Sequence, residues 1–458
     1  MSMRMSPADA VWYLGETPEN PMMISNVLWF DRKLDVSVLR ERLQQRMLDR
    51  HPVMRMKIVD SMVPGVLPRW VEDRDFDLDN HVTESTLPPP GDQASVERLF
   101  SDERSTPLNR DLPLWQIHVR HGYQGDRSIM HTRLHHSIGD GLALTQVMLS
   151  LVDEFDPGAL QISDQPWTQK AGELLGFGRE MLANGSKLAR HPLGMVDVAK
   201  DAANTASWAM KLLAPQMVDR TVLQGRPEGR KIMTWDPEGF DLDETKAAAR
   251  ANGVTINDLV LGSMSGALHR HLSEHDNLVD DVLVMIPINL RAPGAPLPRH
   301  LGNRIGLLPV RLPVRSPDPM ERLLLLRERM EELKASPAPV VSRLLMAGTS
   351  LTTPAVEKQI HRLNQLRGTG VVTNVPGPRF PLHLGGARLA GSVGWGGMTG
   401  RLNLSACFIS LGGRIFSGLV TDHAITPDPQ SLLRYVQQEH RTLLDALPVT
   451  PEPVDGAA

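Results

Sequence analysis

The stretch His135-His136-Ser137-Ile138-Gly139-Asp140-Gly141 determines how the rest of this chain is interpreted. The run before it, 128–134, predicts a strand, and the run after it, 142–155, predicts a helix. Its two glycines permit a sharp turn between these elements. The sequence therefore predicts a strand, a tight turn and a helix, with both histidines at the end of the strand.

The two histidines are expected to play different roles. Successive side chains of a strand point to opposite faces of the sheet, so one ring faces the interior layer and the other faces a cleft. A neutral imidazole at a strand end can take the proton of a hydroxyl that attacks a carbonyl, and such general-base catalysis accelerates a reaction roughly 10²–10⁴-fold. The alternative is that both imidazoles are structural and hydrogen-bonded.

Asp140 has two interpretations. As the N-cap of the helix that follows, its carboxylate would accept hydrogen bonds from free backbone N–H groups. As a partner in an ion pair, it would order the turn beneath the histidines.

Length and composition restrict the class of protein. A chain of 458 residues has room for two or three domains, and 41% hydrophobic with 22% charged residues is typical of a folded, soluble chain. A net charge of −4 without a Lys/Arg block disfavours a nucleic-acid partner. Cys407 is the only cysteine, which excludes an internal disulfide and a multi-cysteine metal centre and favours a reducing compartment. With neither a signal peptide nor a membrane span in the sequence, we expect a cytoplasmic protein.

The chain divides into two mixed regions and a linker. The first, 1–157, alternates predicted strands (23–30, 53–59, 115–120, 128–135) with predicted helices (35–50, 94–101, 142–155). The second, 229–458, contains predicted helices 257–271, 319–334 and 431–447 and strands 282–288, 305–312, 368–373, 402–411 and 415–420. Between them, 158–228 is rich in Gly and Pro and carries two helical stretches, 173–189 and 196–213. We interpret it as a helical crossover linker within an α+β chain.

Several motifs now carry a resemblance. The stretch 135–141 fits the HHxxxDG motif shared by CoA-dependent acyltransferases and condensation domains. Five further motifs resemble those of the bacterial wax ester synthase/diacylglycerol acyltransferase family and occur in its order: Pro113-Leu114-Trp115, Asn257-Asp258, 287–291, Gly302-Asn303 and 374–378. One position departs from that pattern, because Asn289 stands where the family usually has Ser.

The resemblance implies a fold and a reaction. The fold would be two chloramphenicol-acetyltransferase-like domains with a channel between them, entered by acyl-CoA from one side and by a lipophilic alcohol or diacylglycerol from the other. His136 would be the general base, and acyl-CoA would be a co-substrate with no permanently bound cofactor. Transfer would be direct, in agreement with Cys407 lying in an apolar strand pattern and with the absence of a G-x-S-x-G elbow.

The resemblance also suggests further site residues. Asp140, beside His135 and His136, would pair with an arginine, for which Arg291 is the candidate by motif position. Asn257 with Asp258 would position the histidine or stabilise an oxyanion, although Asn257 as a helix cap is the simpler alternative. The predicted lining of the channel consists of Gly141, Trp115, Asn257, Asp258 and Asn374. Cations for the CoA phosphates are available at Arg299, Arg304 and Arg367.

Other patterns support simpler interpretations. His271-Leu272-Ser273-Glu274-His275 matches a short zinc-protease pattern but falls at the polar end of a helix, so no metal site is predicted. The pair Gly262 and Gly266 indicates close helix packing, and the glycines around Trp395 indicate a turn beside the channel. The two linker helices suit either packing on the protein or peripheral contact with a membrane or lipid inclusion.

Two rival functions remain. One is a condensation-domain-like enzyme that takes its acyl group from a carrier protein. The other is a lipid-binding protein of the same fold without turnover. The sequence pattern specifies no oligomeric state, acyl-chain length or preference between alcohol and diacylglycerol.

Overall fold

The computed structural model describes residues 2–63, 65–154, 207–212, 219–291, 297–349 and 368–447. Most of the predicted linker, including helix 173–189, lies outside these residues. Of the second linker helix only 207–212 is described, where Trp208 and Leu212 pack against a hydrophobic core while Met210 is exposed. None of the helices within the described ranges is both long and apolar enough to span a membrane.

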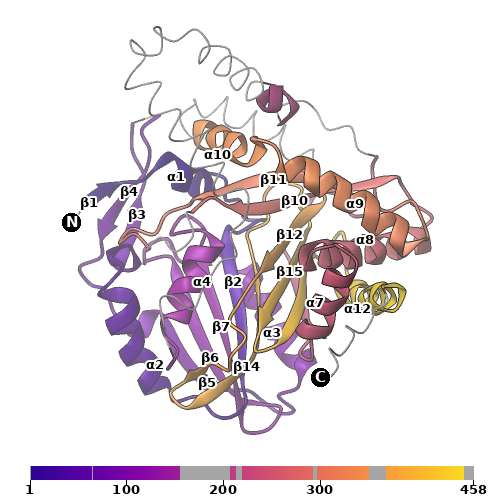
Figure 1. Cartoon of the computed structure of the whole chain (residues 1–458). Coiled ribbons are helices and arrows are strands. Elements are labelled where there is room, and N and C mark those ends of the chain that lie inside the picture. Colours follow the sequence, from indigo (N-terminus) through magenta and orange to yellow (C-terminus); the bar gives the residue numbers. More distant parts are fainter. Residues whose placement is uncertain are drawn as a thin grey trace, which may run out of the picture.

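The first sheet has six strands and is built mainly from the N-terminal half (Figure 1). Its order is β13 (His383–Leu384), β14 (Ala387–Trp395), β2 (Met23–Phe30), β7 (Arg127–His135), β6 (Trp115–Tyr123) and β5 (Val82–Thr86). All neighbouring strands are antiparallel except β5 and β6, which are parallel. A separate small sheet has the order β1 (Ser2–Arg4), β4 (Arg69–Glu72) and β3 (Met56–Val59).

The second sheet belongs to the C-terminal half. Its order is β11 (Ile305–Pro313), β10 (Asp281–Asn289), β12 (Gly370–Val375), β15 (Leu404–Leu411), β16 (Arg414–Asp422) and β8 (Lys231–Trp235), with β9 (Phe240–Asp241) beside β16. β12 runs parallel to both of its neighbours, and the other pairs are antiparallel. The hairpin of β15 and β16 turns at Gly412 and Gly413, both in the left-handed region that glycine adopts without strain.

Helices cover these sheets. The described helices are α1 (Pro7–Leu14), α2 (Val36–Arg42), α3 (Gln93–Ser105), α4 (Gly141–Leu149), α7 (Leu242–Ala251), α8 (Ile256–Glu274), α9 (Pro319–Lys334), α10 (Ala338–Thr349) and α12 (Pro429–Ala446), besides the turn at 207–212. Helices α8, α9 and α12 pack against one another beside the second sheet (Figure 1). Short π and 3-10 segments at 43–48, 52–55 and 78–80 complete the first half.

The helix starts follow from local chemistry. Six helices begin after an aspartate whose carboxylate accepts a backbone N–H, namely Asp35, Asp92, Asp140, Asp241, Asp318 and Asp428. Ser6 and Thr255 cap α1 and α8 in the same way. Such side chains satisfy N–H groups that have no partner inside the helix, which is why these helices start where they do.

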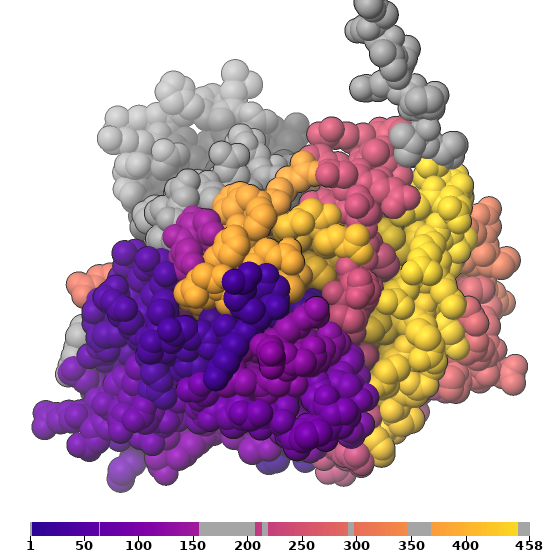
Figure 2. Space-filling view, turned by 90° about the horizontal axis from the view of Figure 1, so that it is seen from below, coloured from indigo at the N-terminus to yellow at the C-terminus, as the bar shows by residue number. Residues whose placement is uncertain are grey.

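One strand joins the two halves. β14 belongs by sequence to the second region, but it pairs along β2 and completes the first sheet. In Figure 2 the orange segment that contains it lies against the indigo and purple surface of the N-terminal half. The assignment of all of 229–458 to a second domain therefore needs a correction, because His383–Trp395 is part of the first sheet.

The prediction of a turn at the glycines around Trp395 is wrong for Gly391 and Gly394, whereas Gly396 and Gly397 follow the end of β14. Gly391 and Gly394 lie inside β14, where an added Cβ would come 2.1 Å from the ring of Trp29 and 1.9 Å from the side chain of Asn26. Glycine is needed there because β2 approaches closely, which sequence alone does not distinguish from a turn.

Candidate active site

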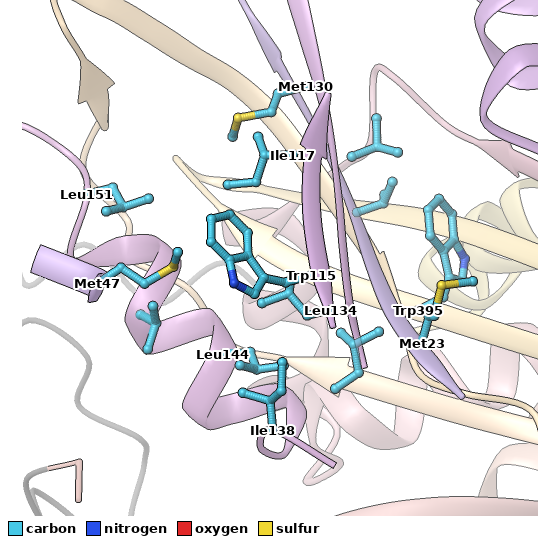
Figure 3. Packing of buried hydrophobic residues seen from close by; sticks show 14 of the residues in the cluster. Met23, Met47, Trp115, Ile117, Met130, Leu134, Ile138, Leu144, Leu151 and Trp395 are labelled. Carbon is cyan, nitrogen blue, oxygen red and sulfur yellow. The ribbon is translucent and has the colours of Figure 1, made fainter. Parts of the chain in front are cut away.

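The histidine doublet lies where β7 leaves the sheet. The backbone N–H of His135 donates to the Leu114 oxygen and that of His136 donates to the Met22 oxygen, at 2.9 and 2.8 Å. These bonds keep the chain extended, so the two rings lie on opposite sides. Ile138 then closes the turn by donating to the His135 oxygen. Figure 3 shows Ile138 packed beside Leu144 of α4, which anchors the turn in the core.

His135 is held by its own surroundings. Its Nδ1 accepts from the backbone N–H of Ser137 at 3.1 Å and lies 2.7 Å from the Ser137 hydroxyl. Because Nδ1 is an acceptor, the ring proton is on Nε2, which lies 3.5 Å from the Glu16 carboxylate. Burial acts to raise the pKa of Glu16, but hydrogen bonds from His135, from Arg110 and from the Met22 N–H outweigh it and lower the pKa to about 2. This carboxylate is therefore ionised, and His135 has no free lone pair.

His136 has the opposite arrangement. Its Nδ1 lies 3.0 Å from the amide oxygen of Asn303, and the amide nitrogen of Asn303 donates to the His136 backbone oxygen at 2.9 Å. An amide oxygen only accepts, so Nδ1 carries the proton and Nε2 carries the lone pair. None of the described residues hydrogen-bonds Nε2. Burial lowers the pKa of His136 to about 4, so the ring is neutral at pH 7.

Asp140 combines both predicted roles. Its Oδ1 accepts from the N–H of Ala143 at 2.9 Å and so caps α4. Its Oδ2 accepts from the Arg291 guanidinium and from the backbone N–H of Arg304, both at 2.8 Å. Asp140 is fully buried and Arg291 is 4% exposed.

The C-terminal half closes over the same turn. Arg291 also donates to the Gly302 oxygen at 2.5 Å, and the Gly302 N–H donates to the Ile138 oxygen at 3.1 Å. Gly302 has a φ of +73°, a conformation that other residues adopt only with strain. The histidine turn is thus held between the two halves by an ion pair and backbone hydrogen bonds.

The structure brings Asn257 and Asn374 together, with the Asn374 amide nitrogen 3.4 Å from the Asn257 oxygen. Asn257 does not cap its helix, because Thr255 occupies that position. Asp258 forms the reciprocal half of this capping box, with its carboxylate accepting from the Thr255 N–H and hydroxyl. Asp258 is therefore a buried capping residue, and the prediction that it lines the channel is corrected.

Trp115 also differs from its prediction as a channel residue. It is 1% exposed, its indole N–H donates to the Met54 oxygen at 2.7 Å, and its ring stacks on His81. Figure 3 shows it among Met47, Leu134 and Leu144 in the core. The aromatic residue of this motif fills the core because its only polar atom is satisfied by backbone.

A small, mostly apolar groove lies between α4, β2, β14 and the ends of β12 and β15. Its lining includes Thr145, Met148, Ser392, Ile409 and all of Val375–Pro378. His136 is not part of the lining. Gly141 begins α4 and lies on the same helix face as Thr145, one turn later, and Met148, two turns later. A Cβ added to Gly141 would meet no atom within 4 Å. The groove thus lies beside α4 from Thr145 onward, one turn from Gly141, and Asn374 is next in sequence to its lining residue Val375.

Other predicted site residues have ordinary surroundings. Arg304 and Arg299 are exposed, and Arg367 lies outside the described residues. His275 Nδ1 bonds the His271 oxygen, and Glu274 bonds Arg270 and Tyr435. In the described ranges no cluster of three or more His, Cys, Asp or Glu side chains could hold a metal ion.

Sequence reasoning missed the contribution of the N-terminal helix. Trp12 stacks on His136 with ring centroids 3.7 Å apart, and Asp9 accepts from both nitrogens of Asn303. The sequence identifies Asn303 only as part of the Gly302-Asn303 motif. The sequence signals for this helix were the Ser6 cap and Trp12. They predict a short helix but do not reveal which residues it contacts.

A histidine doublet at a strand end, held between two mixed sheets, defines the class of acyltransferases and condensation domains with the HHxxxDG motif. Residues 5–260 match the wax ester synthase/diacylglycerol acyltransferase catalytic domain, and residues 301–443 match the C-terminal domain of the same family. The chain belongs to the wax ester synthase/diacylglycerol acyltransferase family, as its motifs predict.

Known proteins agree with this assignment. A probable diacylglycerol O-acyltransferase of Mycobacterium tuberculosis is 28% identical over 469 residues, covering 97% of this chain and 99% of the relative. The wax ester synthase/diacylglycerol acyltransferase of Marinobacter aquaeolei matches the structure with a TM-score of 0.67 and 23% identity, covering 97% and 99% of the two chains. The first condensation domain of the calcium-dependent antibiotic synthetase matches with 0.61 and 16%, covering 98% and 97%. The predicted α+β fold with two related halves is confirmed.

Proposed function

We propose that this acyltransferase moves a long-chain fatty acyl group from acyl-CoA to diacylglycerol or to a long-chain alcohol, and so makes triacylglycerol or wax ester. The observation that carries the proposal is the contact of His136 Nδ1 with the Asn303 amide oxygen at 3.0 Å, which places the ring proton on Nδ1 and the lone pair on Nε2, and burial favours the neutral ring. A neutral imidazole with an open lone pair is what general-base catalysis on a hydroxyl requires.

The proposed reaction is direct. Nε2 of His136 takes the proton of the acceptor hydroxyl as its oxygen attacks the thioester carbonyl, forming a new C–O bond and a tetrahedral intermediate. The C–S bond then breaks, and the imidazolium returns the proton to the departing CoA sulfur. No acyl-enzyme is needed. Cys407 is buried within β15, and burial raises the pKa of its thiol to about 12, which makes it a poor nucleophile.

The apolar groove supports a long-chain substrate. Its lining is dominated by Leu, Ile, Val, Met and Pro side chains, with few polar groups such as Thr145, Ser392 and Ser410. Apolar surface of this kind binds alkyl chains because both leave water on contact. We propose that an acyl or alkyl chain lies there. Such lipids partition into membranes or inclusions, so we also propose cytoplasmic, peripheral contact with a lipid surface, which flotation with vesicles tests.

The test measures CoA release from palmitoyl-CoA with hexadecanol or with diolein. His136→Ala should lower turnover by about 10²–10⁴-fold, the contribution of a positioned general base. Cys407→Ala, a buried residue outside the proposed machinery, should retain turnover. Unchanged release in His136→Ala would remove the proposed base. Release only from an acylated carrier protein would favour the condensation-like alternative, and binding without release would favour a lipid-binding protein.

A further inference from the structure

Helix α1 lies against the face of the site that bears His136. Asp9 and Trp12 are three residues apart on it, and therefore share one side of the helix. Trp12 covers the imidazole with an interplanar angle of 7°, nearly parallel. Asp9 Oδ1 accepts from the Asn303 backbone N–H and from its amide nitrogen, both at 2.8 Å. Both side chains are more than nine-tenths buried.

Asp9 determines which way the Asn303 amide faces. The two groups around its nitrogen, Asp9 Oδ1 and the His136 backbone oxygen, are both acceptors. The amide nitrogen must therefore face them, and the amide oxygen must face Nδ1 of His136. If the Asn303 amide were rotated by 180°, its oxygen would face the Asp9 and His136 oxygens, which are also acceptors. Its nitrogen, a donor, would then face Nδ1 of His136. The ring would then carry its proton on Nε2 and could not act as a base.

We propose that α1 is the positioning element of the general base: Asp9, acting through Asn303, fixes the tautomer of His136, and Trp12 fixes the plane of its ring. The inference rests on the proposed function, because it assumes that Nε2 is the working atom. Asp9, Asn303 and Trp12 are positioning residues and touch no reacting atom. An aromatic face against the ring also stabilises the imidazolium that forms during proton transfer.

The charged groups around His136 do not fix its tautomer, and this role falls to the Asn303 amide. The titratable and charged groups near His136 are His135 and Asp140 on its own turn, Asp9 on α1, Arg291 after β10, Arg304 before β11 and Arg343 on α10. The Asp140 carboxylate is committed to Arg291, to the Arg304 N–H and to α4. The Nδ1 atom of His136 faces the neutral amide of Asn303.

The first test determines the tautomer of His136 by a measurement that does not depend on enzyme activity. Nitrogen-15 NMR of histidine-labelled protein, with the His136 signals assigned by their loss in His136→Gln, should show a protonated Nδ1 and an unprotonated Nε2 at pH 7. In Asp9→Ala one of the two acceptors that hold the Asn303 amide nitrogen is removed, so the Nε2-protonated form should rise. A wild-type ring protonated on Nε2 would overturn the inference even if no variant folds.

The second test uses the pH profile of kcat/KM for CoA release. In the wild type the acidic limb should lie near the pKa of about 4. Asn303→Asp places a carboxylate on Nδ1 and favours the charged ring, so the limb should move up by at least one pH unit. Asn403→Asp, the same change at another buried asparagine without a hydrogen bond to His136, should leave the limb in place. If Asn303→Asp leaves the acidic limb of the kcat/KM profile unchanged, the inference is wrong.

Trp12 is tested by a conservative pair. Trp12→Phe keeps an aromatic face and should retain kcat within about threefold, whereas Trp12→Leu should lose tenfold or more in kcat with little change in KM. Equal losses in both variants would show that Trp12 only fills space. If the wild type releases no CoA while the NMR result stands, the proposed function fails and the positioning role survives.

Discussion

Asp140 shows how one side chain can carry several structural tasks. Its carboxylate caps α4, pairs with Arg291 and accepts the Arg304 N–H, all while fully buried. A buried carboxylate is costly unless it is paired and hydrogen-bonded, so each partner offsets part of its desolvation. The cap and the ion pair, which the sequence presented as alternatives, occupy different oxygens of the same group.

Removing Arg291 should therefore reveal the free-energy cost of burying the Asp140 carboxylate. We expect Arg291→Met to lower the free energy of unfolding by about 3–5 kcal/mol, because Asp140 is left as a buried charge without its counterion. Asp140→Asn/Arg291→Met should recover part of the loss, since Asn can still cap α4. Urea denaturation at pH 7 gives these values.

The exposed pair of Arg379 and Asp243 provides the control for that measurement. Both side chains are more than half exposed, so Arg379→Met should cost less than about 1 kcal/mol. Similar losses in Arg291→Met and Arg379→Met would contradict the view that burial makes the Asp140 pair important.

Sequence spacing located the histidine turn and the candidate partner of Asp140, because both are parts of short motifs. It could not locate Asp9 and Trp12, which meet His136 and Asn303 only after folding. Nor could it decide which histidine has a free lone pair, because that depends on Ser137 and Asn303 facing the two rings from different sides.

At the scale of elements, neighbouring residues at the start of α8 have different roles: some cap the helix, and Asn257 belongs to the candidate site. Thr255 and Asp258 form the capping box, while Asn257 is half-buried and faces Asn374 across to β12. We expect Thr255→Ala to lower the free energy of unfolding by about 0.5–2 kcal/mol. Asn257→Ala should change it by less than about 0.5 kcal/mol and should reduce acyl transfer, if this pair positions substrate.

Both variants are measured by urea denaturation and by CoA release. A loss of stability in Asn257→Ala as large as in Thr255→Ala would make Asn257 a structural residue of the helix start. Full turnover in Asn257→Ala would remove it from the candidate site.

Periodicity and turn residues gave most element positions correctly. Helix 319–334 and strand 23–30 match α9 and β2, and the Gly412–Gly413 turn joins β15 to β16. The main difference is at β14, where the sequence predicts a turn at Gly391 and Gly394 and the structure has a strand. Strand glycines that allow close packing and turn glycines have the same local sequence signal, and only the position of β2 tells them apart.

At the scale of the whole molecule, the two halves are joined by buried polar contacts as well as by β14. Lys231 of β8 bonds Asp422 at 2.9 Å and also Asn20 of the N-terminal half at 2.8 Å. Asn303 reaches Asp9, and Arg291 reaches Asp140, again across the halves. Sequence motifs identify the last pair, but the contacts of Lys231 with Asn20 and of Asn303 with Asp9 join residues more than 200 positions apart in the sequence. The geometry of His136 is therefore a property of the assembled chain.

Histidines with a lowered pKa in both halves make stability depend on pH in a defined window. Burial lowers the pKa of His118, His136 and His440 to about 4, whereas an unfolded histidine has a pKa near 6.5. Between these values the unfolded chain binds protons that the folded chain does not, so stability falls as pH drops from 6.5 to 4. Each such proton contributes a slope of about 1.4 kcal/mol per pH unit.

Glu16 and Glu103 act in a lower window. Their folded pKa values are about 2, so the stability they contribute is present above about pH 4.5 and is lost as pH falls towards 2. Urea denaturation from pH 7.5 to 5.5 stays above the range of these carboxylates. It should show uptake of three or more protons on unfolding, because burial also lowers the pKa values of His51, His81, His131 and His271. His440→Gln, which removes a ring outside the candidate site, should lower that uptake by about one. A free energy of unfolding that is constant or rises on acidification through this range would mean that these rings titrate normally in the folded chain, and the neutral base proposed at His136 would lose its electrostatic support.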